Sequence, residues 1–205
     1  MTRRPLPMFP LGTVLFPHAQ LPIHVFEPRY RKMVEDCLGG DGDFGVVLIE
    51  RGHEVGGGDT RFPVGTLAHI VQAARIPDGR WMLAAVGTRR LRVTEWLPDD
   101  PYPRAHVTLL DEAPPSSNAD AQIREVEHAL RRVHALRAEL GVPAVTEISL
   151  ADDPTRAGFE AAALAPIGSL DAQSLLERDD VEARLEQLLA LLHDEANVLE
   201  FRLSG

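Results

Sequence analysis

Lysine is nearly absent from this chain of 205 residues, because Lys32 is the only one. A phosphate-binding loop of the form G-x-x-x-x-G-K-[ST] requires a lysine, and Lys32 lies outside any such pattern. Lys32 also has no serine near it in the sequence, so a serine–lysine catalytic dyad is not indicated. The scarcity of lysine therefore argues against ATP hydrolysis and proteolysis by this polypeptide.

Cysteine and long apolar runs are scarce as well. Cys37 is the only cysteine, which excludes an intramolecular disulfide and a thiolate metal cluster, and we expect it to be buried or half-buried on a helix. No apolar run approaches the roughly 20 residues that cross a bilayer, and the first residues lack the apolar segment of a signal peptide. These absences predict a cytoplasmic protein without a membrane partner.

Motifs for other catalytic or metal chemistry are missing or incomplete. There is no G-x-S-x-G nucleophile elbow. His128 and His134 are six residues apart, a spacing that does not put two metal ligands on one face of a helix. Asp41-Gly42-Asp43 lacks the later ligands of a calcium loop, and no helix follows Gly56-Gly57-Gly58, so we expect a turn and a hairpin tip. We therefore predict no metal, no cofactor and no enzymatic activity.

Acidic residues outnumber basic ones, and the net charge is −10. Residues 1–113 contain 13 basic and 14 acidic residues, whereas residues 114–205 contain 8 basic and 17 acidic residues. A field of this sign repels phosphate backbones, so nucleic acid is not expected as the main partner, although a local basic patch remains compatible with it.

Residues 1–113 are typical of a small β-rich domain with one helix. Leu21, Ile23 and Val25 occupy alternate positions, which is the period of a strand with one face in a core. Pro28 fits the first turn of a helix that ends at Gly39-Gly40. Further strands are expected at 44–49, 64–74, 81–88, 89–96 and 104–110. Strands at this spacing predict a small, closed or nearly closed barrel.

Residues 114–205 are expected to be helical, after a polar linker at 111–118. A cap at Ser117 or Asn118 starts the first helix, and Asp153-Pro154 starts the second. Two more are expected from Ser169 and from about Asp180. Their apolar stripes need a partner surface, and we expect them to pack both on one another and on the barrel. The fold class is therefore α+β, with domains at 1–113 and 114–205.

Several separated motifs follow one another along the chain. The opening ones are Pro10-Leu11-Gly12, Leu15-Phe16-Pro17, Leu21-Pro22-Ile23-His24 and Phe26-Glu27-Pro28-Arg29-Tyr30. The later ones are Phe44–Val47, Val64–Thr66 with His69-Ile70, Val86–Leu91, Trp96, Leu164–Ile167 and Leu175–Glu177. In this order they resemble the Lon protease N-terminal, substrate-binding domain. The resemblance implies a PUA-like β pseudobarrel with one inserted helix, followed by a C-terminal α-helical bundle.

The resemblance also implies a function. It suggests a stand-alone, non-catalytic module that binds exposed or unfolded polypeptide segments, with a partner protease or chaperone as a further hypothesis. Full Lon enzymes add an ATPase module and a proteolytic module after the region matched here. RNA binding through the PUA-like barrel is an alternative, and a small-molecule enzyme with a ligand beside His24 or His69 is a second alternative.

Two groups of residues are candidates for binding. In the first, either an ion pair ties a strand-to-helix corner together, or an unpaired strand edge and two aromatic rings bind an extended peptide. Its members are His24, Phe26, Glu27, Arg29 and Tyr30. The second group is either a solvated face or a basic patch for RNA or acidic peptides. Its members are Arg75, Arg80, Arg89, Arg90 and Arg92.

Overall fold

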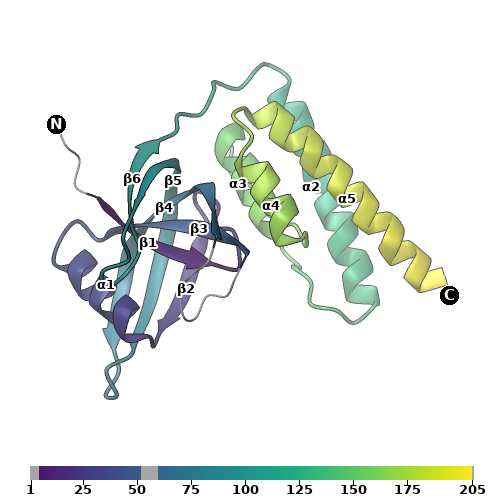
Figure 1. Ribbon diagram of the computed structural model, residues 1–205. Helices are drawn as coiled ribbons and strands as arrows, with labels where there is room; N and C mark the ends of the chain where they lie inside the picture. Colours follow the sequence, from purple (N-terminus) through teal and green to yellow (C-terminus); the bar gives the residue numbers. More distant parts are fainter. Residues whose placement is uncertain (1–4, 52–59, 205) are drawn as a thin grey trace. The chain divides into compact units, whose positions relative to one another are not determined.

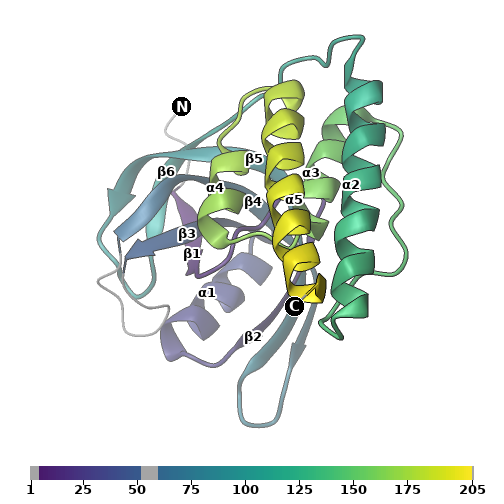
Figure 2. The ribbon, with the colours of Figure 1, turned by 90° about the vertical axis from the view of Figure 1, so that its right-hand side faces the viewer.

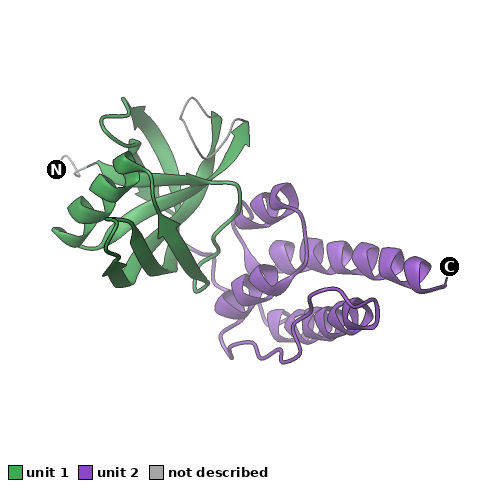
Figure 3. Cartoon of the chain, turned by 90° about the horizontal axis from the view of Figure 1, so that it is seen from below, with its two compact units in different colours: residues 1–111 green, residues 112–205 purple. Residues whose placement is uncertain are grey.

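The computed structural model describes residues 5–51 and 60–204, and the chain divides into two compact units, residues 1–111 and 112–205 (Figure 1, Figure 3). In unit 1 the elements are β1 (Leu6–Leu11), β2 (Gln20–Val25), α1 (Pro28–Leu38), β3 (Asp43–Arg51), β4 (Thr60–Arg75), β5 (Trp81–Leu97) and β6 (Arg104–Leu109). In unit 2 they are α2 (Ala119–Glu139), α3 (Pro154–Leu164), α4 (Ser169–Leu176) and α5 (Val181–Ser204). The predicted α+β class is confirmed, and the glycines at 56–58 lie outside the described residues.

The strands of unit 1 form one mixed sheet in the order β2-β5-β4-β3-β1-β6. Because β5 also pairs with β6, the pairings that lead from β5 through β4, β3, β1 and β6 return to β5. β1 runs parallel to β3, and the other paired strands are antiparallel. Among the described strands, β2 pairs with β5 alone. β2 is therefore an edge strand beside the ring.

The structure corrects one strand assignment. The sequence predicts separate strands at 81–88 and 89–96, whereas the structure has the single strand β5. The expected break falls where the pairing of β5 with β4 shifts register, between Leu67 and Ala68. Such an irregularity bends a strand without ending it. As a result, residues 81–86 of β5 pair with β2 and residues 91–97 pair with β6.

The alternation predicted for β2 is confirmed. Leu21 and Ile23 are half-buried and Val25 is buried, whereas His24 between them is exposed. β2 therefore has one face toward the core of unit 1 and one toward solvent.

Three aromatic rings from different elements meet in that core. The ring centroid of Phe9 in β1 lies 4.5 Å from that of Tyr30 in α1 and 6.3 Å from that of Phe44 in β3, both edge to face. Helix α1 begins at Pro28 as predicted, because an N–H missing from the first turn costs no helical hydrogen bond. Cys37 on the same helix is buried, as expected. These contacts fix the start of α1 against β1.

The segment between β1 and β2 is held by hydrogen bonds to β4 and β5. The backbone N–H of His18 donates to the carbonyl of Gly87 over 2.8 Å, and the N–H of Gly87 donates to the carbonyl of Ala19 over 2.9 Å. The buried Thr66 hydroxyl donates to the carbonyl of Leu15 over 2.5 Å. A Cβ atom on Gly87 would overlap the carbonyl oxygen of Phe16, so glycine permits this close approach. The position where β2 begins is thereby determined.

The helices of unit 2 begin close to where the sequence predicts. The Asp153 carboxylate accepts a hydrogen bond of 2.8 Å from the N–H of Arg156, which caps α3. Asn118 precedes α2 without a side-chain capping bond. Helices α2 and α5 lie side by side, and α3 packs against both (Figure 2). Within the described part of the chain, no helix is both long and apolar enough to span a membrane.

Candidate functional site

A hollow of about 270 Å³ lies where β1 and β2 face each other without pairing. Residues from both strands, from the segment between them and from the start of α1 line it. They are Phe9, Pro10, Leu11, Thr13, Leu21, Pro22, Ile23, His24, Val25, Phe26, Glu27 and Tyr30. The lining is mainly apolar and contains the edge strand β2, so it suits an apolar side chain carried on an extended segment.

Four of the five residues predicted for the peptide rim line this hollow, and Arg29 lies next to them. The Arg29 Nε atom donates to Oε2 of Glu27 over 3.1 Å, with both side chains 18% exposed. The Arg29 guanidinium also lies 4.5 Å from the centroid of the Tyr30 ring. The corner contains the expected ion pair, and the same pair borders the hollow.

Phe26 is an exposed member of the rim, with 52% of its surface accessible. Its ring centroid lies 6.3 Å from that of His24. His24 is directly opposite Met82 of β5 in the strand register, and Met82 is 50% exposed. Residues opposite each other in an antiparallel pair have neighbouring side chains on one face. Phe26, His24 and Met82 thus extend the apolar surface of the rim across β2 onto β5.

Sequence reasoning missed the contribution of Phe9, Leu11, Thr13 and Met82 to this region. The first three belong to the opening segment, and the apolar residues and prolines of that segment were the only local indication that they line a hollow. The local sequence around Met82 does not indicate a role at the rim, because Met82 lies beside His24 only through the pairing of β2 with β5.

The polar groups of the hollow are few. The lining residues with polar side-chain groups are Thr13, His24, Glu27 and Tyr30. Among the described residues, no group of three or more His, Cys, Asp or Glu side chains is arranged to hold a metal ion. His69, the other histidine considered for a ligand cleft, does not line the hollow and has its Nδ1 atom 2.8 Å from Oδ1 of Asp43. The arrangement is suited to binding an apolar group.

The five arginines of the predicted basic patch are divided between two parts of the sheet. Arg75 and Arg80 lie near the turn that joins β4 to β5, and the others lie eight or more residues further along β5. At about 3.3 Å per residue this separates the two groups by roughly 30 Å along the strand. Arg90 is 1% exposed, whereas Arg89 and Arg92 are exposed. The structure does not bring the five into one continuous surface.

Several of these arginines have acidic neighbours. Arg80 pairs with Asp78 over 2.6 Å and Arg89 with Asp111 over 2.6 Å, and Arg75 lies 3.9 Å from Glu35. The hydrogen bonds from Arg80 lower the pKa of the Asp78 carboxyl. A phosphate backbone would have to compete with these carboxylates for the guanidinium groups.

The chain belongs to the family described as the ATP-dependent protease La (LON) substrate-binding domain, whose model matches residues 5–194. The resemblance inferred from the separated motifs is thereby confirmed.

Individual relatives are bacterial Lon proteases. Lon protease 2 of Herpetosiphon aurantiacus is 32% identical over 200 residues, which cover 95% of this chain and 24% of that protein. Lon protease of Escherichia coli K12 is 28% identical over 202 residues, which cover 95% of this chain and 25% of that protein. The chain therefore spans about a quarter of the length of these relatives.

Two solved structures have a similar fold. The Lon N-terminal domain protein from Xanthomonas campestris is 29% identical, with a TM-score of 0.67 over 91% of this chain and 98% of that one. The N-terminal domain of Lon protease from the Mycobacterium avium complex has the same TM-score, 0.67, at 20% identity over 93% of this chain and 99% of that one. At that identity the second similarity concerns the fold alone.

Proposed function

We propose that this chain is a non-catalytic module that recognises exposed apolar segments of other polypeptides. The observation that supports this most is the hollow between β1 and β2, which is bordered by an edge strand and by the exposed Phe26. Membership of the Lon substrate-binding domain family agrees with it. We further propose that unit 1 is a pseudobarrel of the PUA-like type, which is compatible with the ring of strand pairings.

The proposed mode of binding is β-augmentation. An extended segment pairs with the outer edge of β2 and inserts alternate side chains into the hollow. Pro22 interrupts that edge because it has no N–H to donate, so the segment pairs over a short stretch. In this mode, Phe26 and Met82 contact apolar side chains of the bound segment next to the hollow. A short contact of this kind favours weak and broadly selective binding.

A later step follows binding in this proposal. We propose that the bound segment is passed to a protease or chaperone. The proposed compartment is the cytoplasm, where the single buried Cys37 remains reduced.

Fluorescence anisotropy with a labelled, extended ten-residue peptide of alternating leucine and polar residues tests the proposal. Phe26→Ser is expected to weaken binding about tenfold, since an apolar anchor at an interface contributes more than 1 kcal/mol. Val71→Ser is the matched control, because Val71 is 59% exposed on β4 and does not line the hollow. The proposal fails if the unaltered protein does not bind the peptide, or if both variants weaken binding equally.

A further inference from the structure

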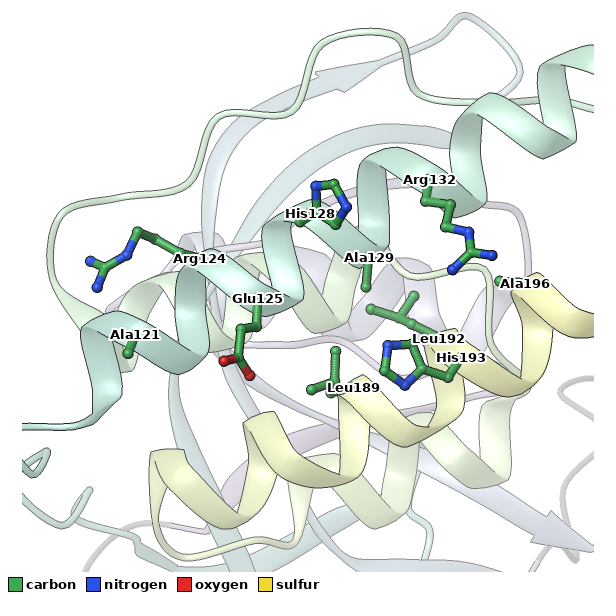
Figure 4. Close-up of a pocket in the computed structure, with 10 residues that line it drawn as sticks. All are labelled: Ala121, Arg124, Glu125, His128, Ala129, Arg132, Leu189, Leu192, His193 and Ala196. Atoms are coloured by element: carbon green, nitrogen blue, oxygen red, sulfur yellow. The ribbon is translucent and has the colours of Figure 1, made fainter.

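A second hollow, of about 540 Å³, lies within unit 2 between α2 and α5 (Figure 4). Both helices run in the same direction along it. Its apolar lining is formed by small and medium side chains, which are Ala121, Ala129, Leu189, Leu192 and Ala196. Alanines at three of these positions leave little side-chain bulk between the two helices. The space between the two helices is therefore a groove with an apolar floor.

The charge of the groove differs from that of the unit that contains it. Residues 112–205 include 18 acidic and 8 basic residues, whereas the lining includes two arginines and one glutamate. Arg124, His128 and Arg132 follow one another at four-residue intervals along α2, and His193 is on α5. Figure 4 shows the single acid, Glu125, turned into the space between the helices. Arg124, His128 and Arg132 thus form a ridge along the α2 side of the groove, with Glu125 beside it.

The arginines of this ridge differ in their ion pairs. Arg132 is paired with Glu200 of α5 over 2.5 Å. Within the described chain, Arg124 forms no ion pair, and it is exposed. An unpaired, solvated guanidinium beside an apolar floor is positioned to meet a carboxylate of a bound molecule.

We propose that this groove binds one amphipathic α-helix of a partner protein, with apolar side chains on one face and carboxylates along one flank. The apolar face lies on the alanine and leucine floor, and the carboxylates face Arg124 and His128. This site is separate from the hollow in unit 1 and does not depend on the function proposed for it.

The dimensions of the groove favour a helix. The lining of α2 extends from Ala121 to Arg132, which corresponds to about 16 Å, or three helical turns, at a rise of about 1.5 Å per residue. Helix axes pack about 8–10 Å apart, and small side chains at the contact permit that distance. A third helix placed over α2 and α5 thus contacts both along three turns, in the manner of helix-in-groove recognition.

The test uses two synthetic 18-residue helical peptides and isothermal titration calorimetry on the whole chain. Both peptides carry leucine at i, i+3, i+4 and i+7, and their flanking residues are glutamate in one and lysine in the other. The glutamate peptide is expected to bind at least tenfold more tightly than the lysine peptide, with an affinity that falls as NaCl is raised. Equal affinity of the two peptides, or no binding of either, overturns the proposal.

Variants locate the binding to the groove. Arg124→Glu is expected to weaken binding of the glutamate peptide at least tenfold, and Leu189→Gln, which makes the floor polar, at least fivefold. Arg202→Glu is the matched charge control, because Arg202 is exposed in the last turn of α5 and does not line the groove. If Arg124→Glu and Arg202→Glu have the same effect, the peptide binds elsewhere and the proposal is wrong.

Discussion

Arg29 and Glu27 are joined by a hydrogen bond of 3.1 Å at the corner where β2 gives way to α1. The same corner borders the hollow, so the pair holds the corner and, under the proposed function, also limits one side of the binding surface. We predict that a double-mutant cycle with Glu27→Gln and Arg29→Gln gives a coupling of about 1 kcal/mol in the free energy of unfolding. Urea denaturation of the four proteins measures it.

The cycle also distinguishes the two roles. If the pair only holds the corner, the peptide affinity of the double variant matches that of the unaltered protein once both are fully folded. A coupling near zero in unfolding, accompanied by a change in peptide affinity, would mean that the pair acts in binding alone.

Thr66 and Thr88 offer a matched comparison of a buried and an exposed hydrogen bond. Thr66 is fully buried and donates to the carbonyl of Leu15, whereas the exposed Thr88 donates to the carbonyl of Leu67 over 3.0 Å. We predict that Thr66→Val lowers the free energy of unfolding by about 1–3 kcal/mol, because the Leu15 carbonyl loses a buried partner. Thr88→Val is expected to change it by less than about 0.5 kcal/mol. Equal losses in thermal denaturation would contradict the importance assigned to the Leu15 contact.

Features set by neighbouring residues were predictable from the sequence. The start of α1 at Pro28, the cap of α3 at Asp153 and the alternation along β2 depend on residues a few positions apart, and the structure confirms all three. The rim residues from His24 to Tyr30 are adjacent in sequence, so their grouping also followed from local order.

Features set by distant pairings were not predictable in the same way. Thr88 resembled a break between two strands, because the irregularity that carries β5 past this point is a property of its pairing with β4. Met82 becomes a neighbour of His24 only through the register of β2 on β5, and the α2–α5 groove requires two helices about 60 residues apart to lie side by side. Local periodicity contains no information about either.

Tyr102 makes a pH-dependent contribution to stability. Burial, together with a hydrogen bond of 2.9 Å from its hydroxyl to Oδ2 of Asp36, raises the pKa of Tyr102 to about 12 from a model-peptide value of 10.0. Because the folded pKa is the higher one, this contribution is present in full below pH 10.0 and is lost as the pH rises toward about 12.

Two measurements check this. The chain has two tyrosines, so absorbance of phenolate in the Tyr102→Phe protein isolates Tyr30, and the difference from the unaltered protein gives the titration of Tyr102. We expect Tyr102→Phe to weaken the fall in unfolding free energy between pH 10 and 12. An unchanged slope over this range would show that the titration of Tyr102 is not coupled to folding.

The Arg184 side chain makes several polar contacts within unit 2. It is fully buried, its guanidinium lies 3.8 Å from the centroid of the Phe159 ring, and its Nη2 atom is 3.1 Å from Oε2 of Glu112. It also donates to the carbonyls of Leu175 and Arg178, so this side chain of α5 connects α3, the end of α4 and the segment that follows α4. Its hydrogen bonds to Leu175, Glu112 and Arg178 require a planar group with several donors.

We predict that Arg184→Ala lowers the free energy of unfolding of unit 2 by about 3–5 kcal/mol, because a buried, ion-paired guanidinium and its hydrogen bonds are lost. Arg184→Lys is expected to restore less than half of this, since an ammonium neither stacks on Phe159 in the same way nor reaches all three acceptors. Arg156→Ala is the control, because the exposed pair of Arg156 with Glu160 is worth about 0.5 kcal/mol or less. Urea denaturation followed by circular dichroism at 222 nm reports on the helices; full rescue by lysine would mean that charge alone, and not the planar guanidinium, stabilises the unit.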